Sequence, residues 1–226
     1  MDFLSIGEYE NLPLHKVVYN KLRESILSGA LKPGEKLIEN EISKKLNISK
    51  TPLREAIREL SQEGLIIHNT RRGIRIIDFS EEDVFEIITL RAELEALGIQ
   101  LAIEKLREED FVVLQEIVDQ LRDASNKEDK VAMAKSDMDF HRFLMHKAGN
   151  SRLEKAWETI ASQMTVLLKM IDFYSCTPNF AEINHRRLID SIRSGDSEKT
   201  SATLKSHILL SQELILDHFH RIKQKT

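Results

Sequence analysis

The stretch from Ile48 to Leu60 constrains the fold of this chain more than any other, because it has the signals of a short helix at both ends. Ser49 is a favourable N-cap, and Pro52 falls in the first turn, where a missing N–H does no harm. Gly64 follows as a stop signal. These signals predict a helix from about 50 to 63.

The two faces of this predicted helix differ in chemistry. At 100° per residue, one arc is apolar and consists of Leu53, Ala56, Ile57 and Leu60. The opposite side presents Lys50, Thr51, Arg54 and Arg58. A row of cations is most often plain solvated surface, so the flanking sequence has to decide whether this row meets nucleic acid.

The flanking sequence favours a DNA-binding unit. Residues 39–46 predict a second short helix, and a tight turn at 47–48 leads from it into the first. Downstream, the β-prone runs 65–68 and 74–77 are joined by a basic tip at 69–73, which predicts a hairpin. Helix, turn, helix and hairpin together predict a winged helix-turn-helix.

The charge distribution points to the same half of the chain. The whole protein has a formal net charge of −4, which by itself argues against a nucleic-acid partner. Residues 1–78, however, contain 13 Lys and Arg against 11 Asp and Glu, a balance of +2, which leaves −6 for residues 79–226. The asymmetry places the predicted DNA contact in the N-terminal half.

The N-terminal half closely resembles the GntR family of bacterial transcription regulators. The resemblance is carried by the segments Leu31–Leu37, Ser49–Ala56 and Glu63–Leu65, and it covers about residues 17–77. It implies that Ser49, Thr51, Arg54 and Gly73 approach phosphates and base edges of DNA. The cations Lys50, Arg58, Arg71 and Arg72 join them as expected contacts.

Length and composition predict a second domain and a cytoplasmic protein. With 226 residues the chain has room for a winged-helix domain at 1–78 and a further domain at 79–226. Membrane insertion is not expected, because no apolar run approaches the ~18 residues of a membrane helix. No secretory signal is visible, and the single Cys176 cannot form an internal disulfide, so we expect a reducing cytoplasm.

The second domain is predicted to be an antiparallel all-α bundle, which makes the fold mainly α. A capping box at Ser80–Asp83 opens it, and turn chemistry divides the remainder into six helices, with a seventh possible. The predicted helices are 81–105, 108–124, 128–148, 152–173, 179–194 and 197–221. No strand pattern interrupts them.

Four polar residues lie on the apolar stripes of these helices. Asp137 and His141 are four residues apart and share one stripe. His185 and His207 each lie 11 residues from Asp196, in the turn between the last two predicted helices, so a helical hairpin would bring them to the same height. Buried without partners, such groups would cost several kcal/mol. One carboxylate and three imidazoles suit Zn²⁺, Ni²⁺, Mn²⁺ or Fe²⁺.

The same residues resemble the FCD effector domain of the FadR-like branch of GntR regulators. The resemblance is carried by the segment Asp137–His141, by Gly149 and Asn150, and by His185 and His207. It implies a divalent metal inside the bundle, held by Asp137 and the three histidines. The alternative is that each histidine is a core residue hydrogen-bonded to a neighbour.

An effector site is expected next to this metal. Arg91 falls on the apolar stripe of the first bundle helix with Glu95 one turn later, and the two can simply form a salt bridge. The family's Arg-x-x-Leu-Glu segment instead implies that Arg91 clamps a ligand carboxylate, and Glu95 and Asn150 are placed beside it.

The sequence therefore predicts a homodimeric regulator that binds an inverted-repeat operator in double-stranded DNA. Its signal would be a small organic acid bound at the metal. Two alternatives remain at this point. One is a regulator that senses the metal itself, and the other is a metal-dependent hydrolase built on the same Asp and His residues, although no catalytic base or nucleophile is evident beyond them.

Overall fold

The computed structural model describes residues 12–69, 73–173 and 180–223. The chain divides into two compact units, Met1–Phe79 and Ser80–Thr226. Each is described here by itself. No helix in the described part of the chain is both long enough and apolar enough to cross a membrane.

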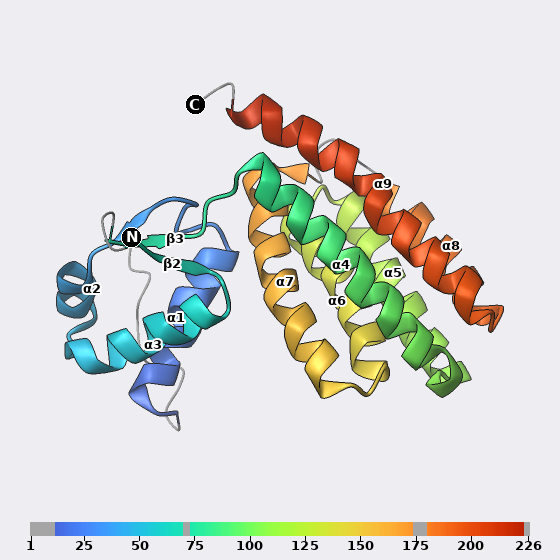
Figure 1. The fold of residues 1–226 in the computed structure, drawn as a ribbon, viewed down its shortest axis with the longest axis horizontal. Coiled ribbons are helices and arrows are strands. Elements are labelled where there is room, and N and C mark those ends of the chain that lie inside the picture. Colours follow the sequence, from blue (N-terminus) through green and yellow to red (C-terminus); the bar gives the residue numbers. More distant parts are fainter. Residues whose placement is uncertain (1–11, 70–72, 174–179, 224–226) are drawn as a thin grey trace. The chain divides into compact units, whose positions relative to one another are not determined.

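The N-terminal unit is a winged helix-turn-helix with three helices and three short strands in its described part (Figure 1). Its elements are α1 (Leu14–Leu27), β1 (Lys36–Leu37), α2 (Glu39–Leu46), α3 (Lys50–Gln62), β2 (Ile66–Asn69) and β3 (Gly73–Ile76). The predicted hairpin is present, with Ile66 opposite Ile76. A third strand was not predicted: β1 pairs antiparallel with β3, which gives the order β1-β3-β2.

The turn between α2 and α3 forms as the sequence predicts. Asn47 ends α2 in the left-handed conformation, with φ of 51°, which an asparagine side chain tolerates better than most. The apolar arc of α3 is buried, while its cationic face is exposed. Helix α1 packs against α3 and fixes it from behind. Polar side chains at the edges of α3 add ion pairs to both neighbours, Lys16 of α1 with Glu59 and Glu39 of α2 with Arg54.

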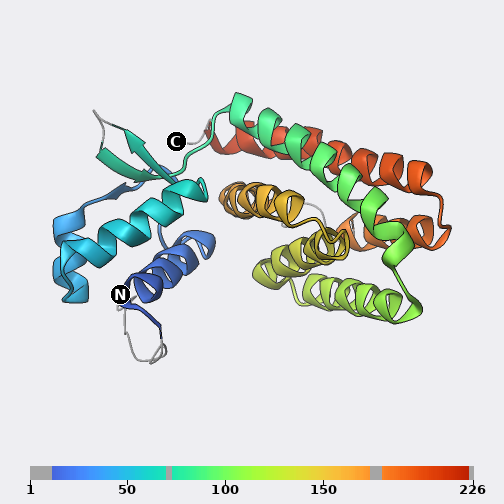
Figure 2. The same cartoon turned by 60° about the horizontal axis from the view of Figure 1, so that its bottom comes forward.

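The C-terminal unit is a bundle of six α-helices in its described part (Figure 2). They are α4 (Glu81–Ala102), α5 (Glu108–Asn126), α6 (Lys130–Lys147), α7 (Ser151–Met170), α8 (Phe180–Arg193) and α9 (Ser197–Lys223). Ser80 and Asp83 form the predicted reciprocal cap at the start of α4. The helix predicted at 81–105 is shorter than expected. Helix α4 ends at Ala102, and a single 3-10 turn, η1 (Ile103–Lys105), follows it.

Two helix pairs position the interior of the bundle. Helices α4 and α9 run side by side in opposite directions in both views (Figures 1 and 2), and Ser201 Oγ donates to Ala96 O at 3.2 Å. Helices α4 and α6 meet closely at Gly98, where an added Cβ would lie only 2.0 Å from Met145 Cε. The predicted break at Cys176–Pro178 lies outside the described residues.

Candidate functional site

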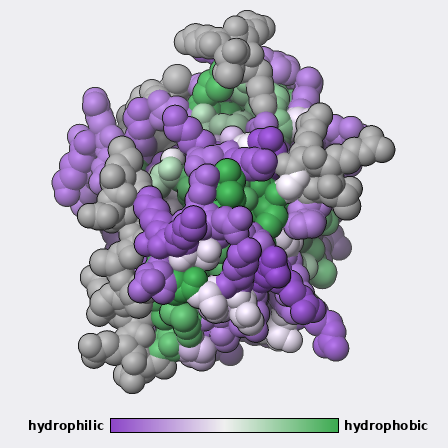
Figure 3. All heavy atoms as spheres, turned by 90° about the vertical axis from the view of Figure 1, so that its left-hand side faces the viewer, coloured by the Kyte–Doolittle hydropathy of each residue, from purple (hydrophilic) through white to green (hydrophobic). Residues whose placement is uncertain are grey.

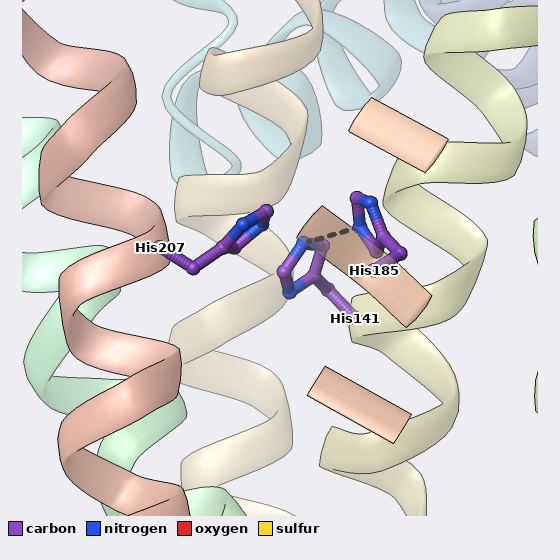
Figure 4. Close-up of side chains that lie close together, drawn as sticks. All are labelled: His141, His185 and His207. Atoms are coloured by element: carbon purple, nitrogen blue, oxygen red, sulfur yellow. Dashed lines mark hydrogen bonds between the residues drawn. The ribbon is translucent and has the colours of Figure 1, made fainter. Parts of the chain in front are cut away.

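Three histidines from three helices meet inside the C-terminal bundle (Figure 4). His141 comes from α6, His185 from α8 and His207 from α9. One ring nitrogen from each lies within 4.8 Å of the others, and the Nε2 atoms of His141 and His185 are 3.3 Å apart. The predicted convergence of the two histidines across the α8–α9 hairpin is therefore present in the fold.

Asp137 approaches the same cluster. Its Oδ1 lies 3.5 Å from His185 Nε2, the atom that also faces His141. Asp137 and His141 are one turn apart on α6 and both are buried, as their shared stripe predicted. All four residues expected at a metal site are thus near one another in the structure.

The electrostatics favour uncharged imidazole at this place. Part of the His207 side chain reaches the surface, but its Nδ1 is buried and has no hydrogen-bond partner among the described residues. Burial, together with the neighbouring rings of His185 and His141 and the charge of Arg91, holds the pKa of His207 well below its ordinary value. A neutral imidazole is the form that binds a metal.

The donor set fits a divalent transition metal. Three imidazole nitrogens and one carboxylate oxygen are ligands that Zn²⁺ and its neighbours in the periodic table accept. Three of the four residues that supply them, Asp137, His141 and His185, are buried. The Nδ1 atom of His207 is buried and has no hydrogen-bond partner among the described residues. A bound ion or an ordered water would satisfy it.

Glu95, one of the expected effector residues, is enclosed in the core of the bundle. Its exposed fraction is 0%, and its side chain contacts α6 and α7. Its Oε1 accepts hydrogen bonds from Arg91 Nε at 2.7 Å and from Trp157 Nε1 at 2.9 Å. Its Oε2 lies 2.5 Å from His141 Nδ1. Burial would raise the pKa of Glu95, but the guanidinium of Arg91 and the contact with the His141 ring together lower it to about 2.

The two other expected effector residues also have structural partners. Arg91 is buried and forms the salt bridge with Glu95 that its spacing allowed. Asn150 is exposed and caps α7, its side-chain oxygen accepting from the N–H groups of Arg152 and Leu153 at 3.2 Å. Of the two, Arg91 is close enough to the histidines for its charge to act on His207.

The N-terminal unit presents the predicted cationic face. Ser49, Lys50, Thr51, Arg54 and Arg58 are all exposed on α3 or at its start. Ser49 occupies the N-cap position, although its hydroxyl makes no capping hydrogen bond. Figure 3 views the side on which α2 lies in Figure 1, and hydrophilic residues cover much of its coloured surface.

A groove of about 840 Å³ runs along this face between α3, the start of α2 and the wing strand. Its lining includes Lys36, Lys50, Arg58, His68 and Gly73. Gly73 opens β3 with φ of 77°, a backbone conformation that glycine adopts without strain. Arg71 and Arg72, predicted at the wing tip, lie outside the described residues.

Sequence reasoning missed three partners at these two sites. Glu39 in the groove binds Arg54, Trp157 holds the carboxylate of Glu95, and Glu95 also contacts His141. Glu39 was assigned only to a helix. A buried indole needs an acceptor for its N–H, so Trp157 did carry a signal.

Family models match both halves of the chain. The model described as "FCD domain" matches residues 86–210, and the model described as "Bacterial regulatory proteins, gntR family" matches residues 14–76. The solved structure "E. coli McbR/YncC" superposes with a TM-score of 0.77, covering 92% of this chain and 99% of that one, at 23% identity. That likeness establishes the fold.

Curated relatives span nearly the whole chain. The HTH-type transcriptional regulator YdhC of Bacillus subtilis is 25% identical over 217 residues, which cover 94% of each protein. The HTH-type transcriptional regulator McbR of Escherichia coli is 25% identical over 196 residues, covering 85% of this chain and 88% of McbR. The Nta operon transcriptional regulator of Aminobacter aminovorans is 26% identical over 186 residues, which cover 82% of this chain and 87% of that regulator.

Proposed function

Because the chain belongs to the GntR family of bacterial transcription regulators and carries an FCD domain, we propose that a small organic acid, bound at a metal centre in its C-terminal bundle, controls its affinity for an operator. The related proteins are transcription regulators and not enzymes, so the chain is a regulator and the hydrolase alternative is set aside. The observation that carries the proposal is the meeting of three histidines and Asp137 inside the bundle.

The DNA partner is double-stranded, and α3 is the helix that enters its major groove. Arg54 and Arg58 are spaced by one turn on the exposed face, and Lys50 stands at the N-terminal end of α3. A recognition helix contacts base edges through its N-terminal residues, which fits this placement. One short helix reads few base pairs, so an inverted repeat read by two copies is expected.

An exposed leucine row on α4 supports a homodimer. Leu90, Leu97 and Leu101 are exposed at spacings of seven and four residues, and the half-buried Leu94 completes the row. Leucines at alternating spacings of four and three form the seam by which two helices pack. A second copy of this chain, with the same row, would cover it around a two-fold axis. A cytoplasmic location follows from the proposed role on the bacterial chromosome.

Asp137 and the three histidines would hold the metal, with Zn²⁺, Ni²⁺, Mn²⁺ or Fe²⁺ as candidates. When bound, the ion would supply a Lewis-acidic centre for a carboxylate oxygen. Arg91 would supply the positive charge for the far end of the acid, because its guanidinium already acts electrostatically on His207. A ligand controls DNA binding only through unequal affinity for two states of the dimer, so the acid must bind one of them better.

A second candidate function is direct sensing of the metal. It is favoured by the Arg91–Glu95 salt bridge, which already occupies the guanidinium that an acid would need. In that case the ion alone would change operator affinity, and organic acids would have no effect.

The test uses the purified chain and DNA. Operator sequences are selected from a random-sequence pool, and affinity for the selected site is then measured with and without a panel of small carboxylic acids. We expect an inverted repeat and an acid whose effect disappears when a chelator removes the metal. An acid effect that survives complete metal removal would contradict the proposed metal centre, and an effect of metal without acid would favour direct sensing.

A further inference from the structure

Glu95 is the most completely enclosed acidic side chain next to the histidine cluster. Its Oε1 accepts from two donors, Arg91 Nε and Trp157 Nε1, and its Oε2 lies 2.5 Å from Nδ1 of the His141 ring. A buried carboxylate is expensive unless it is paired, and three partners from three helices are more than a simple ion pair requires. The arrangement therefore indicates that Glu95 has a role beyond packing.

We infer that Glu95 is a positioning residue for the metal ligand His141, keeping a proton on Nδ1 so that the unprotonated Nε2 faces the other two histidines. The inference rests on the proposed metal centre and deepens it by assigning a residue that is not itself a ligand.

The geometry of His141 carries this inference. Nδ1 lies 2.5 Å from Glu95 Oε2, and Nε2, on the other side of the ring, lies 3.3 Å from His185 Nε2. A neutral imidazole carries one proton, and an ionised carboxylate can only accept. The proton therefore belongs on Nδ1, and the lone pair of Nε2 is directed to the cluster. A carboxylate behind a metal-binding histidine fixes both the tautomer and the ring orientation.

Arg91 and Trp157 hold the carboxylate in this orientation. Both side chains are donors only, so the oxygen that they share has to be an acceptor. This fixes Oε1 toward α7 and leaves Oε2 for His141. Helices α4 and α6 pack together, and the absence of a side chain at Gly98 leaves room between them for the end of the Met145 side chain.

The substitution E95Q separates this role from packing, since glutamine has the same shape. With its amide oxygen kept by Arg91 and Trp157, the amide NH₂ group faces His141 Nδ1 and donates to it. Nδ1 then has to accept, and the ring proton moves to Nε2, into the metal position. We expect E95Q to bind Zn²⁺ about 10- to 100-fold more weakly than the wild type.

The decisive readout is the ring tautomer of the metal-free protein. ¹⁵N-labelled histidine is observed by long-range ¹H–¹⁵N correlation, and the His141 signals are assigned by their loss in H141N. We expect a protonated Nδ1 in the wild type and a protonated Nε2 with a bare Nδ1 in E95Q. The matched control is E93Q, two residues away on α4, where an exposed carboxylate pairs with Lys205. It should keep both the wild-type tautomer and the wild-type Zn²⁺ affinity.

A bare Nδ1 on His141 in the wild type would overturn the inference, and so would E95Q with unchanged tautomer and Zn²⁺ affinity. If E95Q fails to fold, the wild-type tautomer decides alone. A wild type that binds no Zn²⁺ but has a proton on Nδ1 would defeat the proposed metal centre while supporting the hydrogen bond inferred here, so the two failures are distinguishable.

Discussion

Arg54 on α3 and Glu39 on α2 form a two-pronged ion pair on the proposed DNA-binding face. Arg54 Nε lies 3.0 Å from Glu39 Oε1, and Arg54 Nη2 lies 3.0 Å from Glu39 Oε2. The hydrogen bond from Arg54 lowers the pKa of Glu39, and the same bond raises the pKa of Arg54. The pair therefore restricts the direction of the Arg54 guanidinium on a helix whose other cations, Lys50 and Arg58, are exposed.

Replacing Arg54 tests whether this side chain reads the operator. Arg54→Ala should weaken binding to the selected operator by about 1–3 kcal/mol, because a well-placed arginine discriminates a base by that amount. It should leave binding to unrelated DNA much less changed. Fluorescence anisotropy at one fixed salt concentration measures both affinities. Equal losses on operator and unrelated DNA would instead assign Arg54 to phosphate contacts.

Replacing Glu39 tests the orientation of Arg54. Glu39→Gln removes the charge but can still accept one hydrogen bond, so Arg54 is less constrained and the local negative charge disappears. We expect tighter binding to unrelated DNA, because less negative charge faces the phosphates. The ratio of the affinity for the operator to the affinity for unrelated DNA should therefore be smaller. The same anisotropy titrations supply that ratio. A ratio equal to that of the wild type would show that Glu39 plays no part in specificity.

Arg91→Lys tests the proposed effector contact while protecting the core. Alanine at this position would remove the cation beside a buried Glu95, and the resulting loss of stability would hide any effect on the effector. Lysine keeps the positive charge but cannot form two parallel N–H hydrogen bonds to one carboxylate. We expect unchanged operator affinity in the absence of acid. The acid concentration that gives half of the effect should be clearly higher than in the wild type. A wild-type dose response in Arg91→Lys would remove Arg91 from the effector site.

We expect the packing of α1 against α3 to depend on pH. Tyr19 Oη donates to Glu63 Oε2 at 2.7 Å, and burial together with this hydrogen bond raises the pKa of Tyr19 to about 12. A pKa raised in the folded state stabilises the fold below the unfolded value of about 10, and this contribution is lost as the pH rises from about 10 through 12.

The variant Tyr19→Phe checks this dependence. It should be less stable than the wild type by about 1 kcal/mol at neutral pH, the usual net value of one hydrogen bond. Between pH 10 and 12 the difference should shrink, since only the wild type has this phenol to ionise. Urea unfolding followed by circular dichroism at each pH gives both values. A constant difference up to pH 12 would mean that the Tyr19–Glu63 bond does not stabilise the fold.

Local signals predicted most of the fold. The capping box at Ser80, the left-handed turn at Asn47 and the apolar arc of α3 depend on neighbours in sequence, and all three have the expected form. Strand β1 was missed because two residues have no periodicity, and it exists only because β3 offers an edge to Lys36 and Leu37.

The candidate site was predictable to the level of single helices but not of their contacts. Spacing along α6 and around the α8–α9 turn was sufficient to expect two pairs, Asp137 with His141 and His185 with His207. The resemblance to the FCD domain joined the pairs into one site. The link from Glu95 to His141 depends on the axial offset between α4 and α6, which only the packed bundle defines. No pattern in either helix alone encodes that register.

The most direct test of the account is the metal content of the purified protein. The wild type and the variants His141→Ala, His185→Ala and His207→Ala are compared with His146→Ala, a control on α6 whose exposed ring pairs with Glu154 instead of the cluster. Elemental analysis of each sample, together with its thermal unfolding, gives the number of ions per chain and the stability that they add.

We predict about one divalent ion per chain in the wild type and in His146→Ala, and a large loss in each of the other three variants. An ion present at 100 times its dissociation constant stabilises the folded state by about 2.7 kcal/mol, so these three should also unfold at lower temperature. Full occupancy in all three variants would contradict a metal centre at His141, His185 and His207.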